Sequence, residues 1–394
     1  MATAPQLSRR TFAQLLGMGA GAALLAPVQG RGGEERLAAW ARGEWRPAKL
    51  LPKESANLVL LNSNENPYGP SPAALEAMVE AHSVSMRYPD YWADQLQERL
   101  AAFHGVDPEM AVVTCGSTEV LKLAAMAFLA PGRRLVVPRP TFEAMGYYAR
   151  LAGAEVVEVP VGPDYRSDLA ALARTARERP GLVYLCNPNN PTGTLVSAAA
   201  VREFLTGVPA ESVVLVDEAY YHYPDDPGYG TLLEAVRAGR NVVVARTFSK
   251  IYGMAGLRLG YGIARKDWIE KMRPHQVIES WNVMACAAAL ASLEDTDYVN
   301  RNRRLNQEVR DALAAAMKKR GREVIPSQTN FVCIHVGAPV RPVIQAFREQ
   351  GVSVGRPFAG LEEHIRVSLG TPEEMEKFLA GFDRVMASAA ARRI

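Results

Sequence analysis

A lysine, Lys250, stands shortly after the apolar, strand-like run 241–245, and Arg258 follows it along the chain. A lysine near a strand end, shielded from water and close to another cation, can have its pKa lowered enough to act as an amine nucleophile. The hydroxyls of Thr247 and Ser249, together with the guanidinium of Arg258, suit a phosphate group. A phosphate-bearing aldehyde meets both needs, so pyridoxal phosphate (PLP) is the predicted cofactor. Because most lysines are solvated surface charges, this prediction depends on other segments.

Two further segments end strand-like runs with polar residues that suit the same cofactor. Asp217 closes the run 213–217, and a carboxylate out of water is costly unless it meets a cation or a proton donor. The protonated pyridine nitrogen of PLP would be that partner. Asn190 and Tyr220 can both donate a hydrogen bond to the phenolic oxygen of the ring. Two simpler interpretations stay open: Asp217 could cap a helix, and 189–193 could be a plain turn.

A Gly-Ser-Thr sequence follows the strand-like run 112–114 and is expected to open a helix. Backbone N–H groups and the helix dipole make such a terminus a ready phosphate site. We therefore assign Ser117 and Thr118 to the same phosphate as the three residues around Lys250. An ordinary helix cap is the alternative interpretation of this motif.

Taken together, these motifs make the chain resemble the class I/II PLP-dependent aminotransferases of fold type I. Within them it looks most like the histidinol-phosphate aminotransferase branch, over roughly residues 58–382. The matching motifs, in chain order, are Asn64-Glu-Asn-Pro-Tyr-Gly-Pro70, Arg87-Tyr-Pro-Asp90, Cys115-Gly-Ser-Thr-Glu119, Pro188-Asn-Asn-Pro-Thr-Gly193, Asp217-Glu-Ala-Tyr220, Thr247-Phe-Ser-Lys250 with Arg258, and Arg366-Val-Ser-Leu-Gly370. As a set they are specific for the family and much less specific for the substrate.

The resemblance implies roles for the residues that match. Lys250 would be the lysine that forms a Schiff base with PLP and moves the substrate's α-proton, while Asp217 and Tyr220 would be the other catalytic residues. Phe142 would stack on the pyridine ring, at a position where many relatives carry Tyr. Tyr88 resembles the family's tyrosine that reaches the neighbouring subunit's phosphate, which implies a homodimer with a shared active site.

The substrate would meet a second set of residues. A planar, bidentate cation suits an α-carboxylate, and the resemblance makes Arg366 that group, although a surface arginine on a strand is the alternative. Asn66, Tyr68 and Arg356 are further candidates for substrate binding. Relatives carry an arginine within a Val-Arg-Pro segment, whereas this chain has a glycine, Gly355, before Arg356. This departure argues against a phosphorylated amino donor.

The expected activity is transfer of an amino group between a small-molecule amino donor and a 2-oxo acid acceptor by a ping-pong mechanism. Histidinol-phosphate transamination is one alternative. A decarboxylase, racemase or lyase of the same fold is another, and a PLP-binding regulatory protein is the non-enzymatic alternative.

Composition is that of an ordinary globular protein: 394 residues, 48% hydrophobic and 22% charged, with a formal net charge of +3. This small charge, without a basic stripe interleaved with aromatics, gives no support for nucleic-acid binding. The four cysteines are scattered through apolar contexts, and the histidines are dispersed, so we predict no disulfide and no metal site.

The amino terminus resembles a twin-arginine (Tat) export signal. Arg9 and Arg10 precede an uncharged, Gly/Ala-rich run, 13–28, which has about the length of a signal sequence and is short for a membrane span. We expect export to the periplasm. The sequence leaves open whether the signal is cleaved or stays as a tether to the membrane. The alternative is an amphipathic or disordered tail on a cytoplasmic protein.

The remaining pattern predicts an α/β fold in which a large domain has a mostly parallel sheet between helices, with a smaller α+β domain. Short apolar runs bounded by turns alternate with helices, and ligands of such sheets bind at the carboxyl ends of the strands. The expected strands are 58–61, 112–114, 135–138, 156–160, 183–186, 213–217, 242–245, 259–263, 331–335, 352–354 and 365–368. The expected helices are 71–80, 92–104, one from 118, one from 142, 297–320 and one from about 371.

This organisation divides the chain into four parts. We expect a signal segment at 1–30, an arm packed on the small domain at 31–70, a large PLP-binding domain at 71–290, and the small domain at 291–394.

Overall fold

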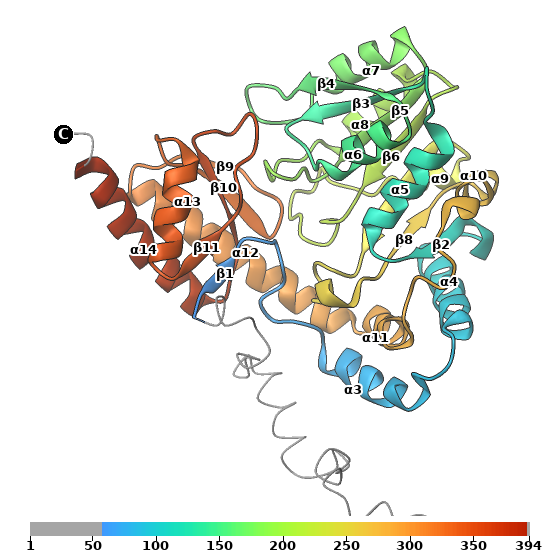
Figure 1. The fold of residues 1–394 in the computed structure, drawn as a ribbon, viewed down its shortest axis with the longest axis horizontal. Helices are drawn as coiled ribbons and strands as arrows, with labels where there is room; N and C mark the ends of the chain where they lie inside the picture. The colour runs from blue at the N-terminus through green and yellow to red at the C-terminus, as the bar shows by residue number, and fades with distance from the viewer. Residues whose placement is uncertain (1–56, 392–394) are drawn as a thin grey trace, which may run out of the picture. The chain divides into compact units, whose positions relative to one another are not determined.

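A computed structural model describes residues 57–391, so the expected signal segment and most of the expected arm lie outside the described part of the chain. Figure 1 shows a larger body built around a sheet, and a smaller body of short strands and helices that contains the carboxy-terminal helix. Among the residues that the structure describes, no helix is long and apolar enough to cross a membrane.

The larger body carries a seven-stranded sheet with the order β2-β8-β7-β6-β5-β3-β4. Its strands are β2 (Ala111–Thr114), β3 (Arg134–Arg139), β4 (Glu155–Pro160), β5 (Gly181–Cys186), β6 (Val213–Asp217), β7 (Val242–Thr247) and β8 (Gly260–Ile263). All described pairings among the other strands of this sheet are parallel, whereas β8 runs antiparallel to both β2 and β7. The predicted α/β fold with a mostly parallel sheet is confirmed.

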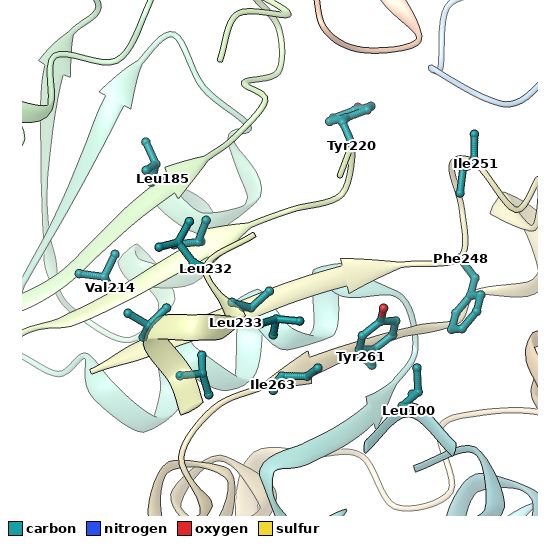
Figure 2. Close-up of a cluster of buried hydrophobic side chains, with 14 of the residues drawn as sticks. Leu100, Leu185, Val214, Tyr220, Leu232, Leu233, Phe248, Ile251, Tyr261 and Ile263 are labelled. Carbon is teal, nitrogen blue, oxygen red and sulfur yellow. The ribbon is translucent and has the colours of Figure 1, made fainter. Parts of the chain in front are cut away.

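Helices cover both faces of this sheet because residues along each strand alternate between two apolar clusters. One cluster packs the sheet against α4 (Asp90–His104), α7 (Leu169–Glu178), α8 (Ala198–Gly207), α9 (Leu233–Arg237) and α11 (Val283–Glu294). The other packs it against α5 (Ser117–Phe128), α6 (Ala144–Leu151) and α10 (Lys266–Met272). Figure 2 shows the first cluster, in which Tyr220 and Ile251 lie on the loops beyond the strand ends.

Two short sheets form the smaller body. One has the order β12-β10-β9, with β9 (Val324–Ile325), β10 (Phe331–His335) and β12 (His364–Ser368) all antiparallel. In the other, β1 (Val59–Leu61) pairs in parallel with β11 (Val352–Val354). Their common core includes residues of α12 (Thr296–Lys319), α13 (Val340–Glu349) and α14 (Pro372–Ala391). The domain boundaries expected from the sequence stay a prediction.

Two helix starts follow from local side-chain chemistry. Ser71 caps α3 (Pro72–Ala81) by accepting a hydrogen bond from the N–H of Ala74, with proline at the first position. At α14, Thr371 and Glu374 form a reciprocal capping box, in which each side chain accepts from the other residue's N–H. The sequence interpretation left out β9 and the helices α7, α8, α9, α10, α11 and α13. Of these, β9, α9 and α10 are short, and α11 is apolar on every side.

The remaining described elements are single turns of 3₁₀ helix. They are η1 (His82–Val84), η2 (Pro108–Met110), η3 (Ala255–Leu257) and η4 (Arg273–His275).

Candidate active site

The predicted cofactor residues gather at one edge of the large sheet. The carboxyl end of β2 leads into Ser117 at the start of α5, and those of β5, β6 and β7 carry the loops with Asn190, Tyr220 and Lys250 respectively. Because β8 runs the other way, Arg258, which precedes it, comes to the same edge. Parallel strands thus place at one edge side chains that are far apart in the sequence.

Lys250 lies in this loop region with its amine held by backbone oxygens. Its Nζ donates to the carbonyl oxygens of Asn64 at 3.0 Å and Ser63 at 3.4 Å. Burial, together with the nearby guanidinium of Arg366, lowers the pKa of Lys250 to about 8. The amine therefore loses its proton more readily than an exposed lysine does, which a nucleophile requires.

Asp217 ends β6 as a buried carboxylate. Its Oδ2 accepts from the hydroxyl of Tyr184 at 2.9 Å, and its Oδ1 accepts from the N–H of Ala219 at 3.1 Å. Burial raises the pKa of Asp217 to about 6, against the lowering effect of Tyr184. No helix begins directly after Asp217, since the next one, α9, starts at Leu233, so the helix-cap interpretation is wrong.

Arg366 is a buried cation on β12 that faces the same region. Its Nη1 donates to Oδ1 of Asn190 at 2.7 Å, and its Nη2 donates to the carbonyl of Asn62 at 2.8 Å. Its Nε has no hydrogen-bond partner among the described residues, nor does the guanidinium form an ion pair with any of their carboxylates. Burial lowers the pKa of Arg366 below its usual value. A buried cation without a counter-ion is suited to bind an anion.

A cradle for an anion lies at the amino terminus of α5. Gly116 is its N-cap, with φ +75° and no side-chain cap hydrogen bond. A Cβ at this position would lie 2.4 Å from Nη2 of Arg258, so the missing side chain lets the guanidinium approach the helix terminus. Nη1 of Arg258 donates to the hydroxyl of Ser249 at 3.2 Å, and that hydroxyl also accepts from Thr247 at 2.9 Å. Three of the predicted phosphate residues are therefore in one hydrogen-bonded group beside the helix.

Tyr220 is held by a residue that the sequence interpretation did not single out. Its hydroxyl accepts a hydrogen bond from Nδ2 of Asn64 at 3.0 Å, which leaves the phenolic proton to be donated elsewhere. Burial raises the pKa of Tyr220, so the hydroxyl stays protonated at neutral pH. Asn64 sits in the matched motif 64–70, but the motif alone did not indicate which asparagine faces Lys250.

The other substrate candidates lie in different surroundings. Nδ2 of Asn66 donates to the carbonyl of Ile251 at 2.8 Å and to Oδ1 of Asn302 at 3.2 Å. Tyr68 is partly buried beside Asn302 and Asn306 on α12. These contacts place both side chains against α12 rather than against the amine of Lys250.

Arg356 and Glu143 form an exposed ion pair at 2.5 Å, with side chains 52% and 62% exposed. The guanidinium of Arg356 lies 4.3 Å from the centroid of the Phe358 ring, and that of Arg366 lies 4.8 Å from the same centroid. Glu143 directly follows Phe142, the predicted stacking ring, which is partly buried. The pair therefore links the residue after Phe142 to the segment whose Phe358 ring contacts Arg366, and no local sequence pattern indicated it.

Behind Asp217 a second charged pair is fully buried. Arg246 donates to Oε2 of Glu218 at 2.7 Å, with side chains 3% and 1% exposed. Thr231 and the N–H of Leu232 also donate to Glu218. The pair ties β7 to the loop that follows β6, so it supports the backbone on which Asp217 and Tyr220 lie.

The sequence matches the family model for aminotransferase class I and II over residues 56–382. The chain belongs to the class I and II aminotransferases.

Its relatives are consistent with this family. The chain is 43% identical to a histidinol-phosphate aminotransferase of Symbiobacterium thermophilum over 325 residues, covering 82% of this chain and 89% of that protein. It is 39% identical to the one of Moorella thermoacetica, covering 84% and 86%. A solved histidinol-phosphate aminotransferase of Sinorhizobium meliloti, in complex with pyridoxal-5'-phosphate, matches with a TM-score of 0.79 and 26% identity, covering 88% of this chain and 98% of that one.

The chain is a PLP-dependent aminotransferase, and its site fits the cofactor. A partly buried lysine with a lowered pKa, a buried carboxylate, and a helix terminus joined by an arginine match the aldehyde, the pyridine nitrogen and the phosphate.

Proposed function

We propose that this aminotransferase moves an amino group between an amino acid and a 2-oxo acid, with Arg366 binding the carboxylate that both share. The observation that carries the proposal is the buried guanidinium of Arg366, which lacks an anionic partner among the described residues and has its Nε unpaired. A substrate carboxylate would supply the missing charge in a bidentate pair. Arg366 lowers the pKa of Lys250 through its charge, which supports a substrate whose α-carbon would lie beside the amine.

When bound, PLP acts as the electron sink for the substrate's α-carbon. Lys250 would carry the cofactor and then take the α-proton on its Nζ, since its lowered pKa makes it a competent base near neutral pH. Asp217 would hold the pyridine nitrogen protonated. Tyr220 and Asn190 would donate to the phenolic oxygen of the cofactor. The hydroxyl oxygen of Tyr220 accepts from Asn64 and Oδ1 of Asn190 accepts from Arg366, which leaves the O–H of Tyr220 and the Nδ2 of Asn190 to donate.

The phosphate would lie at the start of α5. Ser117 and Thr118 offer hydroxyls and backbone N–H groups there, and Arg258, Ser249 and Thr247 complete the cradle. Phe142 would cover one face of the pyridine ring.

Histidinol phosphate is the second candidate donor, because the curated relatives carry that name. Its phosphate would need Arg356, and Glu143 already neutralises this cation. Asn66 and Tyr68 would contribute through the loop at 64–70. The ion pair and the glycine before Arg356 favour an ordinary amino acid as the donor.

The proposed assembly is a homodimer in which Tyr88 reaches the phosphate of the second copy. The side chain of Tyr88 is 76% exposed, beside the exposed Met86 and Tyr91. Burying such large apolar side chains against a second copy is favourable. Export through the twin arginines, ahead of the described residues, is also part of this proposal.

The deciding experiment measures both half-reactions against a panel of amino donors that includes histidinol phosphate, with 2-oxoglutarate as an acceptor. Truncating a buried charge-pair partner costs about 2–5 kcal/mol, so Arg366→Ala should lower kcat/KM for the amino acid and its 2-oxo acid together. Arg356→Ala serves as the matched control and should leave neutral amino acids unchanged. Efficient turnover of histidinol phosphate that depends on Arg356 would instead make the phosphorylated donor the substrate.

A further inference from the structure

Tyr184 lies on β5 directly beside the strand that ends in Asp217. The register pairs Cys186 with Asp217 and Tyr184 with Leu215, so the three side chains of Tyr184, Cys186 and Asp217 share one face of the sheet. Tyr184 is fully buried among the apolar residues that face α5 and α6. There its hydroxyl donates to Oδ2 of Asp217 at 2.9 Å.

A phenylalanine would pack in this apolar cluster without a polar atom to satisfy. Burying a hydroxyl is costly unless it forms a hydrogen bond, and the bond that Tyr184 forms goes to the carboxylate. The presence of the hydroxyl is therefore explained by Asp217 rather than by packing.

We propose that Tyr184 is a positioning residue that keeps Asp217 ionised and turned toward the pyridine nitrogen of the cofactor. This inference rests on the role proposed above for Asp217. The carboxylate has two oxygens, and the hydrogen bonds from Tyr184 and from the N–H of Ala219 fix one each. The remaining lone pairs are left to face the cofactor.

The hydrogen bond decides where one proton lies. A carboxylate that accepts from a donor is a weaker base, so a proton shared with the pyridine nitrogen moves toward the ring. Burial, together with the charge of Glu218, pushes the other way and raises the pKa of Asp217 to about 6, while Lys250 acts with Tyr184 to lower it. Cys186 and Tyr220, the other titratable groups close to the carboxylate, stay neutral because burial raises the pKa of each.

The test compares Tyr184→Phe with Tyr261→Phe. Tyr261 is an equally buried tyrosine of the same sheet, on the opposite face, and its hydroxyl pairs with His104 at 2.9 Å. Each holoenzyme is titrated with acid and base while the absorption of bound PLP and kcat are recorded. The thermal midpoint of the PLP-free protein is measured alongside.

In Tyr184→Phe the carboxylate becomes more basic and is protonated over a wider pH range. The acid limb of kcat should therefore move to higher pH by about one unit, so kcat should fall about tenfold at pH 5 and about twofold near pH 7. The pH midpoint of the cofactor's absorption change should rise. A pyridine ring without its positive charge withdraws fewer electrons, so the nitrogen that would join PLP to Lys250 becomes more basic. Tyr261→Phe should move neither quantity.

A second substitution strengthens the donor without changing its shape. Site-specific Tyr184→3-fluorotyrosine has a more acidic hydroxyl, so the acid limb should move to lower pH. This variant tests the inference even if Tyr184→Phe does not fold.

Two results would overturn the inference. One is a Tyr184→Phe profile that matches Tyr261→Phe, and the other is an unshifted fluorotyrosine profile. The variant Asp217→Asn separates this failure from failure of the proposed function. If Asp217→Asn is nearly inactive while Tyr184→Phe is normal, Asp217 has its proposed role and Tyr184 does not act through it. If Asp217→Asn itself turns over normally, both proposals fail.

Discussion

The carbonyl oxygen of Asn64 accepts a hydrogen bond from Nζ of Lys250 at 3.0 Å, which joins the loop after β1 to the reactive amine. The same residue donates from Nδ2 to Tyr220 and from its N–H to Ser368. Its φ of 54° lies in the left-handed region, which asparagine tolerates better than most residues. Asn64 therefore helps to position both the amine of Lys250 and the hydroxyl of Tyr220.

Replacing Asn64 should separate these two effects. Asn64→Gly keeps the left-handed backbone and loses the side-chain bonds to Tyr220 and Ser368. Asn64→Ala loses the same bonds and also strains the backbone by about 1 kcal/mol. We expect both variants to lose turnover and only Asn64→Ala to lose thermal stability markedly. Steady-state rates and thermal midpoints decide this, and equal stability of the two variants would contradict the backbone part.

Capture of PLP should depend on pH through Lys250. Its pKa is lowered to about 8, so the amine changes from charged to neutral as pH rises through that value. Only the neutral amine attacks an aldehyde, and the rate of PLP uptake by PLP-free protein should rise from pH 6.5 to 9 with a midpoint near 8. Borohydride trapping at Lys250, followed by mass spectrometry, measures it.

The same shift affects stability. Because the folded pKa lies below the ordinary value of 10.5, the folded protein holds fewer protons on this group, and its contribution to stability grows as pH rises from about 8 to 10.5. Lys250→Ala should lose the visible band and this part of the pH dependence. A stable coloured complex in that variant would show that another amine holds PLP.

The ion pair with Glu143 should make Arg356 less available to bind an anionic group of a substrate. Exposed ion pairs contribute about 0.2–1 kcal/mol, so Glu143→Gln should raise kcat/KM about two- to fivefold for substrates whose side chain ends in a carboxylate or phosphate. Neutral amino acids should be unaffected. The double variant Glu143→Gln with Arg356→Ala is the control, and a gain that survives in it would mean that Glu143 acts on the substrate directly.

The buried pair of Arg246 and Glu218 should matter far more to stability than an exposed pair. Removing one partner of such a pair costs about 3–5 kcal/mol, so Glu218→Gln should lower the urea midpoint strongly. Glu109, which pairs with Lys266 on the surface at 2.7 Å, gives the comparison. Glu109→Gln should leave the urea midpoint nearly unchanged. Similar losses in the two variants would show that the buried pair contributes no more to stability than the exposed one.

Replacing Arg9 and Arg10 with lysine should leave the protein in the cytoplasm with unchanged specific activity. The twin arginines are the proposed export signal and precede the matched family region. Cell fractionation followed by immunoblotting measures the distribution. An unaltered distribution would favour the alternative of a plain amino-terminal tail.

The parts of the site that lie at strand ends could be predicted from sequence because each follows a recognisable apolar run. Asp217, Lys250 and the α5 terminus are of this kind, and the parallel sheet brings them to one edge. Their individual roles stay predictions until variants are measured.

Other contacts could not be predicted, because they depend on geometry between segments. The bond from Tyr184 needs the register of β5 against β6, which no local pattern specifies. The choice between Asn64 and Asn66 depends on a left-handed backbone at Asn64. The pair of Glu143 and Arg356 joins two exposed residues from different parts of the chain.

The pairing of β1 with β11 has a consequence for how the protein is made. Residues 59–61 are translated 293 residues ahead of their partners, 352–354 (352 − 59 = 293). The first described strand must therefore remain unpaired through most of synthesis, while the larger body can already fold. Because the loop after this strand carries Asn64, the lysine amine would be the last part of the site to be set in place. A nascent chain released early would have a folded sheet and an incompletely held Lys250.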